Sequence, residues 1–554
     1  MSDIMKSIPF GQLTEWILNE YKKTGQVFGI QKAYVADQSK TIEIFGRKLE
    51  NPIGPAAGPH TQLAQNLVAA YVAGARFFEL KTVQKMDGQE LSACIPKPCI
   101  VAEEEAYNCE WSTELYVPQA MEEYIKGWIL IHVIAKEFGI GSPDGFQFNM
   151  SCGYNLEGIK DKKIDDFIEG LKDAGDTAIF KECKQWLLEH ISLFEHVTKE
   201  DVEAIPAKVC NSITLSTMHG CPPQEIENIV RYLLKEKHIN TYVKCNPTLL
   251  GYEFVRKAMD DLGYDYMAFT DFHFKDDLQY EDAVPMLKRL METAAQEGLS
   301  FGVKLTNTFP VDIKRQELPG EEMYMSGKAL FPLSISVASR LAESFDGKLP
   351  MSFSGGADQK NIDQIVDCGI WPVTVATVLL KPGGYKWMTK IAEKADSCEI
   401  GKCGEVQVET LKKLAEDSLT DAHYRKTGRK AAGKRTEEKS PLLDCLKKNG
   451  VGEKKDFTAH KRVCGNCADV CPNRANVLIE VPEMEFLQIL HVDYMCNECG
   501  NCRSFCQYAG APYKDKFTLF ATEEDMKDST NNGFTVLDTE TKEVRVRVGD
   551  KEQI

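Results

Sequence analysis

The sequence predicts an α/β protein whose first 394 residues form a (β/α)8 barrel, followed by smaller C-terminal segments. Three observations predict the barrel: short β-rich runs alternate with longer helical patterns, eight such units follow one another, and polar or glycine-bearing residues follow the runs. Repeated β-then-α units favour a parallel sheet, and eight of them suggest a closed barrel. At 554 residues the chain exceeds one compact domain, since a typical domain holds about 150.

Most of the predicted strands are apolar over four to six consecutive residues, as strands buried on both faces are. They begin at Asn51, Ala75, Gly145, Ser212, Thr241, Phe301, Pro350 and Val373. A ninth strand-like run, YDYMAFTD at Tyr264, is interpreted as an excursion between strands five and six. The strand ends carry amide, Lys and Gly groups, in the position where a barrel places its active-site loops. The alternative is that loops are generally polar and glycine-rich.

The pattern changes after residue 394. Residues 395–455 carry helical patterns and a basic run, RKTGRKAAGKRTEEKS from Arg425, which is either a solvated linker or a surface that steers an acidic partner. Residues 456–515 are rich in cysteine, and residues 516–554 form a tail in which GFTVLDTETKEVRVRV predicts a β-hairpin.

Charge and hydropathy exclude several classes of function. The formal net charge is −17, which argues against nucleic acid or an anionic membrane as the main partner. There is no run of about 18 apolar residues that would predict a membrane span. The N-terminal residues lack the basic segment and apolar core of a secretory signal, so a cytoplasmic location is expected.

Cysteine is the most informative residue type. Of nineteen cysteines, seven fall between Cys464 and Cys506, and twelve are scattered from Cys94 to Cys445. Scattered cysteines are usually small buried hydrophobes. Disulfides are rare in reducing compartments, so the dense group indicates a metal or redox site.

The dense group predicts two iron–sulfur clusters. Cys496, Cys499, Cys502 and Cys506 match C-x2-C-x2-C-x3-C, in which three thiolates ligate one [4Fe–4S] cluster and the fourth ligates the other. The first run lacks one ligand, because Lys461 stands where its first Cys would be. Zinc is the alternative, but seven cysteines in this spacing fit two cubes better than tetrahedral sites. The predicted ligand sets are Cys471, Cys496, Cys499 and Cys502 for the complete cluster, and Cys464, Cys467 and Cys506 for the other.

The open position of the second cluster has three interpretations. It takes a remote thiolate (Cys445, Cys398 and Cys403 are available), a non-Cys ligand, or nothing, which leaves a three-iron cluster.

A barrel joined to a single-electron module needs a group that converts single electrons into hydride, and a flavin does so. Gly355 and Gly356 end strand seven, and ATVLLKPGG follows strand eight, where barrels bind a cofactor phosphate through backbone N–H groups. Lys81, Lys244 and Lys304 lie near strand ends and would offset the negative charge of a flavin.

These motifs carry a family resemblance. NPIGPAAGPHTQLAQNLVAAYVAGARFFELKTVQ resembles the opening of the dihydroorotate and dihydropyrimidine dehydrogenases, and TNT, SGKALFPLSI and SFSGG are similar to their late-barrel series. The resemblance covers about Asn51 to Tyr385, and the bacterial-type two-[4Fe–4S] ferredoxin module continues it. The chain also resembles the barrel and ferredoxin parts of a large iron–sulfur flavoprotein described as a selenate reductase subunit.

The resemblance implies FMN as cofactor and assigns site residues. Those that would contact FMN or its phosphate are Ala57, Gly58, Lys81, Thr82, Lys244, Gly327, Gly355, Gly356, Ala376 and Thr377. Those that would read a polar ring are Asn108, Asn307 and Thr308.

The catalytic position departs from the family pattern N-L-S-C-P, and two segments compete for it. FNMSCG supplies Cys152, whereas TLSTMHGCPP supplies Thr217 and Cys221 and better fits the fourth strand. Threonine is a poor proton donor, so the choice lies between Cys221 and Cys152, with Cys221 preferred. His219 beside Cys221 either poises that thiol or is incidental.

No G-x-G-x-x-G follows a strand and opens a helix, so NAD(P) binding by this chain is not expected. The expected function is hydride transfer between FMN and a C=C or C=N bond of a purine- or pyrimidine-like heterocycle. Two clusters would relay electrons to or from a separate FAD/NAD(P)-binding subunit in a hetero-oligomer. The alternatives are an oxyanion (selenate) reductase subunit and a non-catalytic electron-transfer subunit.

Overall fold

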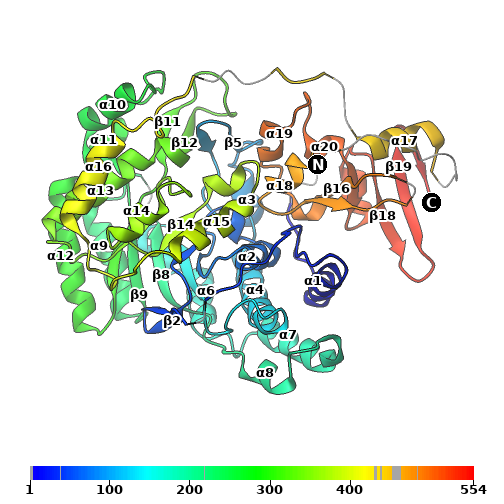
Figure 1. Ribbon diagram of the computed structural model, residues 1–554, viewed down its shortest axis with the longest axis horizontal. Coiled ribbons are helices and arrows are strands. Elements are labelled where there is room, and N and C mark those ends of the chain that lie inside the picture. The colour runs from blue at the N-terminus through cyan, green and yellow to red at the C-terminus, as the bar shows by residue number, and fades with distance from the viewer. Residues whose placement is uncertain are drawn as a thin grey trace.

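The computed structural model describes residues 4–37, 39–216, 219–428, 433–436, 440–451, 463–482 and 484–554. The predicted (β/α)8 barrel is confirmed, because eight parallel strands form one sheet in the order β3-β14-β13-β10-β9-β8-β7-β4 (Figure 1). Each strand falls within, or within two residues of, one of the eight predicted runs. The strands are β3 (Ile53–Pro55), β4 (Phe77–Glu79), β7 (Gln147–Cys152), β8 (Cys210–Ser216), β9 (Asn240–Cys245), β10 (Phe301–Leu305), β13 (Met351–Phe353) and β14 (Val373–Val375).

The barrel closes between β3 and β4. The N–H of Arg76 donates to the carbonyl oxygen of Ile53 at 2.8 Å, which joins the two ends of the sheet. A Cβ atom at Gly54 would lie 1.5 Å from the carbonyl oxygen of Phe77. The close approach of these strands therefore requires the glycine of the NPIG sequence.

Helices cover the outside of the barrel, each with its apolar side against the strands. In α9 (Pro223–Lys235) the buried Ile226, Ile229, Val230 and Leu233 recur at helical spacing. The segment at Tyr264 contributes no barrel strand; Ala268 makes only an isolated bridge to Asp312. The other covering helices are α2 (Ala64–Val72), α4 (Val117–Glu137), α6 (Lys162–Lys172), α10 (Tyr252–Asp261), α12 (Tyr280–Gln296), α13 (Phe331–Ser344), α14 (Ile362–Asp367) and α15 (Lys386–Ala395).

A second, antiparallel sheet was not predicted. Its order is β11-β12-β6-β5, with β5 (Ile100–Ala102), β6 (Ala106–Asn108), β11 (Phe309–Asp312) and β12 (Glu322–Ser326). These strands come from the insertions that follow β4 and β10, so they stand at the C-terminal end of the barrel. There they form one wall of a cavity.

The cysteine-rich segment packs against the barrel and continues into the tail (Figure 1, orange to red). Short helices α18 (Asn466–Asp469) and α19 (Asn501–Phe505) accompany β15 (Asn476–Ile479) and β16 (Gln488–Val492). Strand β16 pairs in parallel with β17 (Phe517–Phe520), and the predicted hairpin, β18 (Gly533–Asp538) and β19 (Glu543–Val548), extends the same sheet. The first part of the preceding segment lies against the barrel, since Tyr424 stacks on Phe331 at a centroid distance of 4.6 Å.

Within the described ranges, every helix is too short or too polar to cross a membrane.

Candidate active site

A cavity of about 610 Å³ lies at the C-terminal mouth of the barrel. Twelve of the thirteen residues predicted to bind cofactor or substrate line it: Ala57, Gly58, Lys81, Thr82, Asn108, Lys244, Asn307, Thr308, Gly327, Gly356, Ala376 and Thr377. Gly355 is the exception. A Cβ atom there would lie 1.8 Å from Oγ of Ser334, so this glycine lets the strand end pack against α13.

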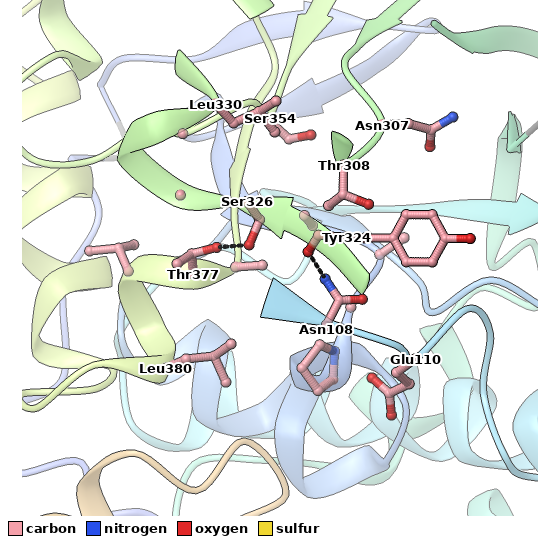
Figure 2. Close-up of a pocket in the computed structure, with 18 of the residues that line it drawn as sticks. Asn108, Glu110, Asn307, Thr308, Tyr324, Ser326, Leu330, Ser354, Thr377 and Leu380 are labelled. Carbon is pink, nitrogen blue, oxygen red and sulfur yellow. Dashed lines mark hydrogen bonds between the residues drawn. The ribbon is translucent and has the colours of Figure 1, made fainter. Parts of the chain in front are cut away.

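One end of the cavity is a backbone cradle. Gly327 and Gly356 have φ values of +78° and +82°, a conformation that favours glycine. A Cβ atom at Gly356 would lie 2.4 Å from the carbonyl oxygen of Gly327, and one at Gly327 would lie 2.8 Å from Cγ2 of Thr377. The hydroxyl groups of Thr377 and Ser326 are 2.9 Å apart beside this cradle (Figure 2). A side chain at either position would collide with these neighbours, so the close packing of the cradle requires both glycines.

Two lysines bring positive charge to the same end. Lys328 and Lys381 both line the cavity. Lys328 forms an ion pair with the carboxylate of Glu104 at 3.2 Å, whereas Lys381 donates to the backbone carbonyl oxygen of Glu104 at 3.2 Å. Burial lowers the pKa of Lys381, and the neighbouring Lys328 adds to that effect. The glycine backbone of this cradle and the two lysines together suit an anionic group such as a phosphate.

Buried lysines also lie along the floor. Lys81 and Glu110, with side chains 2% and 1% exposed, form an ion pair at 2.8 Å. Burial lowers the pKa of Lys244, and Glu79 opposes the shift. Lys304 is inside the barrel below the cavity, where it donates to Thr374 at 2.6 Å and pairs with Glu79 at 3.1 Å. Burial lowers the pKa of Lys304 to about 8 despite that pair.

The predicted substrate-reading amides are held on the cavity wall. Asn108 ends β6 and donates to the carbonyl oxygen of Tyr324 at 3.4 Å. Asn307 follows β10 and donates to Oδ1 of Asn246 at 2.6 Å. Figure 2 shows Asn307 and the ring of Tyr324 on the side away from Thr377 and Leu380. The cavity therefore has an anion-binding end and an amide-bearing end.

The two cysteines predicted as proton donors are not among the described residues that line the cavity. Strand β7, the third of the barrel, buries Cys152, whose side chain is 1% exposed and whose pKa is raised to about 12 by burial. Cys221 follows β8, the fourth strand, and burial followed by the charge of Glu225 raises its pKa to about 11. Thr217 lies outside the described residues.

Several polar cavity residues were not predicted as site residues, and another, His219, was considered only as a neighbour that either poises the Cys221 thiol or is incidental. His219, Glu110, Trp111 and Tyr324 line the cavity. Glu110 and Trp111 stand within three residues of Asn108, so the loop that carries that amide was the available signal. Tyr324 comes from the unpredicted antiparallel sheet. The partner of His219, Asp277, is 58 positions away, and no local pattern connects them.

Five of the seven clustered cysteines are buried, and Cys467 is one of them. Cys471, Cys496, Cys499 and Cys502 are buried, whereas Cys464 is exposed and Cys506 is half-buried. Burial and then the neighbouring thiolates, Cys471 first among them, raise the pKa of Cys502 well above its ordinary value. For Cys467 burial dominates, Lys516 opposes it, and Cys464 and Cys506 add to the rise.

This chemistry suits iron–sulfur clusters. The N–H of Ala475 donates to Sγ of Cys471 at 3.2 Å, and that of Glu498 to Sγ of Cys496 at 3.3 Å, bonds of the kind that tune cluster thiolates. Among the described residues, no three or more His, Cys, Asp or Glu side chains are arranged to hold a metal ion. The thiolates of a cubane bind different irons, so they are spaced more widely than the ligands of one ion.

Of the remote cysteines proposed as a missing ligand, Cys403 is held at the other end of the barrel, where its Sγ lies 3.4 Å from the hydroxyl of Tyr242 on β9. Cys398 follows α15, and Cys445 is on α17 (Pro441–Asn449). Lys461 lies outside the described residues.

The fold and the cavity define a TIM-barrel protein with a ligand site of the enzymatic type at the C-terminal ends of its strands. The chain belongs to the family described as "Oxidoreductase YgfK, N-terminal TIM-barrel domain", whose profile matches residues 28–426. It is therefore a member of an oxidoreductase family.

Two relatives come from Escherichia coli, strains K12 and O157:H7, and both are named "Putative oxidoreductase YgfK". Each is 46% identical to this chain over 459 residues, which cover 80% of this chain and 44% of the relative. The chain thus matches less than half the length of these relatives.

Proposed function

We propose that the chain is an FMN- and iron–sulfur-dependent oxidoreductase that transfers hydride between FMN and a C=C or C=N bond of a purine- or pyrimidine-like ring. The observation that carries the proposal is the two-ended cavity. Gly327, Gly356 and Thr377 would hold the phosphate of FMN, with Lys328 and Lys381 nearby. Lys81 and Lys244 would contact the ring system. FMN, when bound, supplies the hydride chemistry.

The amide-bearing end supports catalysis over simple electron relay. Asn108 and Asn307 offer both donors and acceptors, which suit the edge of a polar heterocycle. A non-catalytic electron-transfer subunit has no use for such groups. An oxyanion reductase would use a metal centre in contact with substrate, and the described lining residues are not of that kind.

The cysteine sets would relay single electrons. The set of Cys471, Cys496, Cys499 and Cys502 lies against the cavity wall, because Ile100, which lines the cavity, is hydrogen-bonded to Cys499. Since the sequence offers no dinucleotide fingerprint, the electrons would come from or go to a separate FAD/NAD(P)-binding protein.

Thr377→Asp tests the phosphate end. A carboxylate beside the glycine cradle should repel a phosphate, because two like charges in a shielded site repel by several kcal/mol. The purified variant should therefore contain less than about a tenth of the wild-type FMN. Thr377→Val is the matched control, because it has nearly the same shape without the charge, and it should keep most of its flavin. FMN is measured by fluorescence after denaturation. Full FMN content in Thr377→Asp would contradict the proposal.

The second experiment tests the amide-bearing end. Uracil and xanthine, added to the oxidised holoprotein, should perturb the flavin absorbance spectrum, and Asn307→Leu should weaken that binding at least tenfold. An unperturbed spectrum with both bases would reject this class of substrate.

A further inference from the structure

The loop after the fourth barrel strand places a histidine in the cavity. His219 lies three residues beyond β8, lines the cavity, and has a side chain that is 17% exposed. Its ring lies parallel to that of Tyr324, with centroids 6.0 Å apart and an interplanar angle of 16°. The imidazole is therefore oriented by an aromatic wall of the same cavity.

Asp277 fixes the ring from behind. Nδ1 of His219 lies 2.8 Å from Oδ2 of Asp277, whose side chain is 1% exposed. The same carboxylate accepts from the hydroxyl of Thr248 at 2.6 Å and from the N–H of Gly220 at 2.9 Å. Burial would raise the pKa of Asp277, but these hydrogen bonds, that of His219 foremost, outweigh it and lower the pKa. An ionised Asp277 accepts Nδ1–H, which leaves Nε2 of His219 to meet a ligand.

The dyad is connected to the substrate-reading end. Asn246 donates to Oδ2 of Asp277 at 3.0 Å, and its own Oδ1 accepts from Asn307 at 2.6 Å. One hydrogen-bonded chain thus sets the position of the Asn307 amide and of the His219 ring together. A ring held by Asn307 would meet an imidazole whose orientation is fixed by the same network.

The charged and titratable groups that surround His219 are few. His273, whose ring centroid is 5.1 Å away, is paired with Glu322 at 2.6 Å. Asp276 lies beside Gly220, and Lys244 is on the cavity floor. The other neighbours are Asp277 and Tyr324.

We propose that His219 is the catalytic acid–base residue of this cavity, and that Asp277 is its positioning residue. The inference deepens the proposed function and rests on it. It replaces the cysteine donors expected from the family resemblance, because Cys152 and Cys221 are not among the described lining residues, whereas His219 is.

In the direction of reduction, the proposed step adds one hydride and one proton to the substrate double bond. A hydride supplied by the reduced flavin forms a C–H bond at one atom of the substrate double bond, and the electron pair of that bond moves to the other atom. The Nε2–H bond of the imidazolium breaks, its proton forms the new C–H or N–H bond, and His219 becomes neutral. The substrate would gain two electrons, which a bound reduced flavin would supply with the hydride, and water would restore the proton to His219.

The dyad is tested without turnover by acylating the full-length holoprotein with diethyl pyrocarbonate, which reacts with neutral imidazole. Mass spectrometry of the peptide that carries His219 gives the rate of modification at each pH. Asp277→Asn should change the pH profile of this rate, because Nδ1 of His219 loses its carboxylate partner. An unchanged profile in Asp277→Asn would overturn the positioning role.

The catalytic role is tested by stopped-flow spectroscopy of dithionite-reduced holoprotein mixed with uracil or xanthine. His219→Gln should slow flavin reoxidation by about 10²–10⁴-fold, the usual size of general acid catalysis. Binding of the base, read from the flavin spectrum, should change by less than about threefold. His273→Gln, the neighbouring histidine that is outside the cavity wall, is the matched control and should stay within about threefold of wild type.

The outcomes separate the two proposals. A fast His219→Gln together with a slow Cys221→Ala would overturn the inference and restore the cysteine as donor. Failure of wild type to bind flavin would reject the proposed function, and failure of both bases to reoxidise it would reject the substrate class. In either case the acylation profiles still decide whether Asp277 controls His219.

Discussion

The backbone N–H of Ile100 donates to the carbonyl oxygen of Cys499 at 2.8 Å, and the N–H of Cys99 donates to the same oxygen at 3.0 Å. Ile100 lines the cavity, and Cys499 is a predicted ligand of the complete cluster. A single loop contact therefore connects the cavity wall with the predicted ligands of one cluster. In the proposed function the set of Cys471, Cys496, Cys499 and Cys502 would therefore exchange electrons with the cavity. Cys464 of the other set is exposed.

Asn497 provides a side-chain bridge at the same place. Its amide donates to Oε1 of Glu110 at 3.1 Å and to Oε1 of Glu114 at 2.8 Å. Asn497→Leu would leave two buried carboxylates without that donor, so stability should fall by about 1–3 kcal/mol. Anaerobic thermal unfolding followed by circular dichroism measures the loss.

Asn497→Leu should also slow electron transfer between the proposed clusters and flavin, because Asn497 joins the cysteine-rich segment to the loop of Glu110 and Glu114. Asn531→Leu is the control. The side-chain amide of Asn531 donates to the carbonyl oxygen of Tyr513 at 2.9 Å and, more weakly, to the hydroxyl of Thr518. Both partners lie in the C-terminal sheet region and not in the barrel. Asn531→Leu should leave the rate of flavin reduction by dithionite unchanged. Equal rates in all three proteins would show that Asn497 has no part in coupling.

The two cysteine sets predict different consequences of losing one ligand. Anaerobic wild type should hold about seven or eight irons, from two clusters of up to four irons each. Cys464→Ser should lose the cluster that Cys464 would ligate and about half of the iron, while the flavin stays reducible by dithionite. Cys499→Ser should lose the other cluster and, with it, the connection to the cavity. Iron analysis and electron paramagnetic resonance distinguish these states, and wild type with about four irons would contradict two clusters.

The eight barrel strands could be predicted because each is a continuous apolar run with its own local signal. The β18–β19 hairpin was predictable for the same reason, from its alternating residues. The antiparallel sheet β11-β12-β6-β5 was not, because its strands are only three to five residues long. Its two halves are joined by pairing between β12 and β6 across more than 200 positions, Ser326 with Ala106 for example. Positions of the cavity residues followed from the rule that barrel sites lie at strand ends.

The parts of the site that depend on long-range contacts could not be read from the sequence. Asp277 meets His219 only because the segment after β9 folds back toward the loop after β8. Cys152 looked suitable by motif, but every residue of its strand is buried, and Cys152 shares the face of Phe148, which packs against Trp128 of α4. Motif matching selected loops that line the cavity, and packing decided which of their side chains reach it.

Closure of the barrel depends on Gly54. A methyl group there would collide with the carbonyl oxygen of Phe77 on β4, which is backbone and cannot move aside. Gly54→Ala should therefore lower stability by about 3 kcal/mol or more, or prevent soluble expression. Gly401→Ala is the control, since nothing lies within 4 Å of its Cβ position. A wild-type melting temperature in Gly54→Ala would show that β3 and β4 are not in contact.

His132 gives the fold a measurable dependence on pH. It is on α4, its Nδ1 lies 2.9 Å from the carbonyl oxygen of Trp128, and burial lowers its pKa to about 4 from an ordinary 6.5. Between those values the unfolded chain binds the proton and the folded chain does not, so stability falls as pH falls through this window. One such histidine changes the free energy of unfolding by about 1.4 kcal/mol per pH unit within this window.

His132→Phe should remove that part of the slope, because a phenyl ring can pack against Trp128 and Phe146 without taking up a proton. Melting temperatures measured anaerobically between pH 7 and pH 5 should fall less steeply in His132→Phe than in wild type. Wild type and variant both keep the contributions of His60 and His491, whose pKa values burial lowers to about 3 and about 4. The difference between the two curves therefore belongs to His132. Exposed His196, changed to Gln, should give a curve parallel to wild type. Parallel curves for His132→Phe as well would mean that the buried ring is not kept neutral by its surroundings.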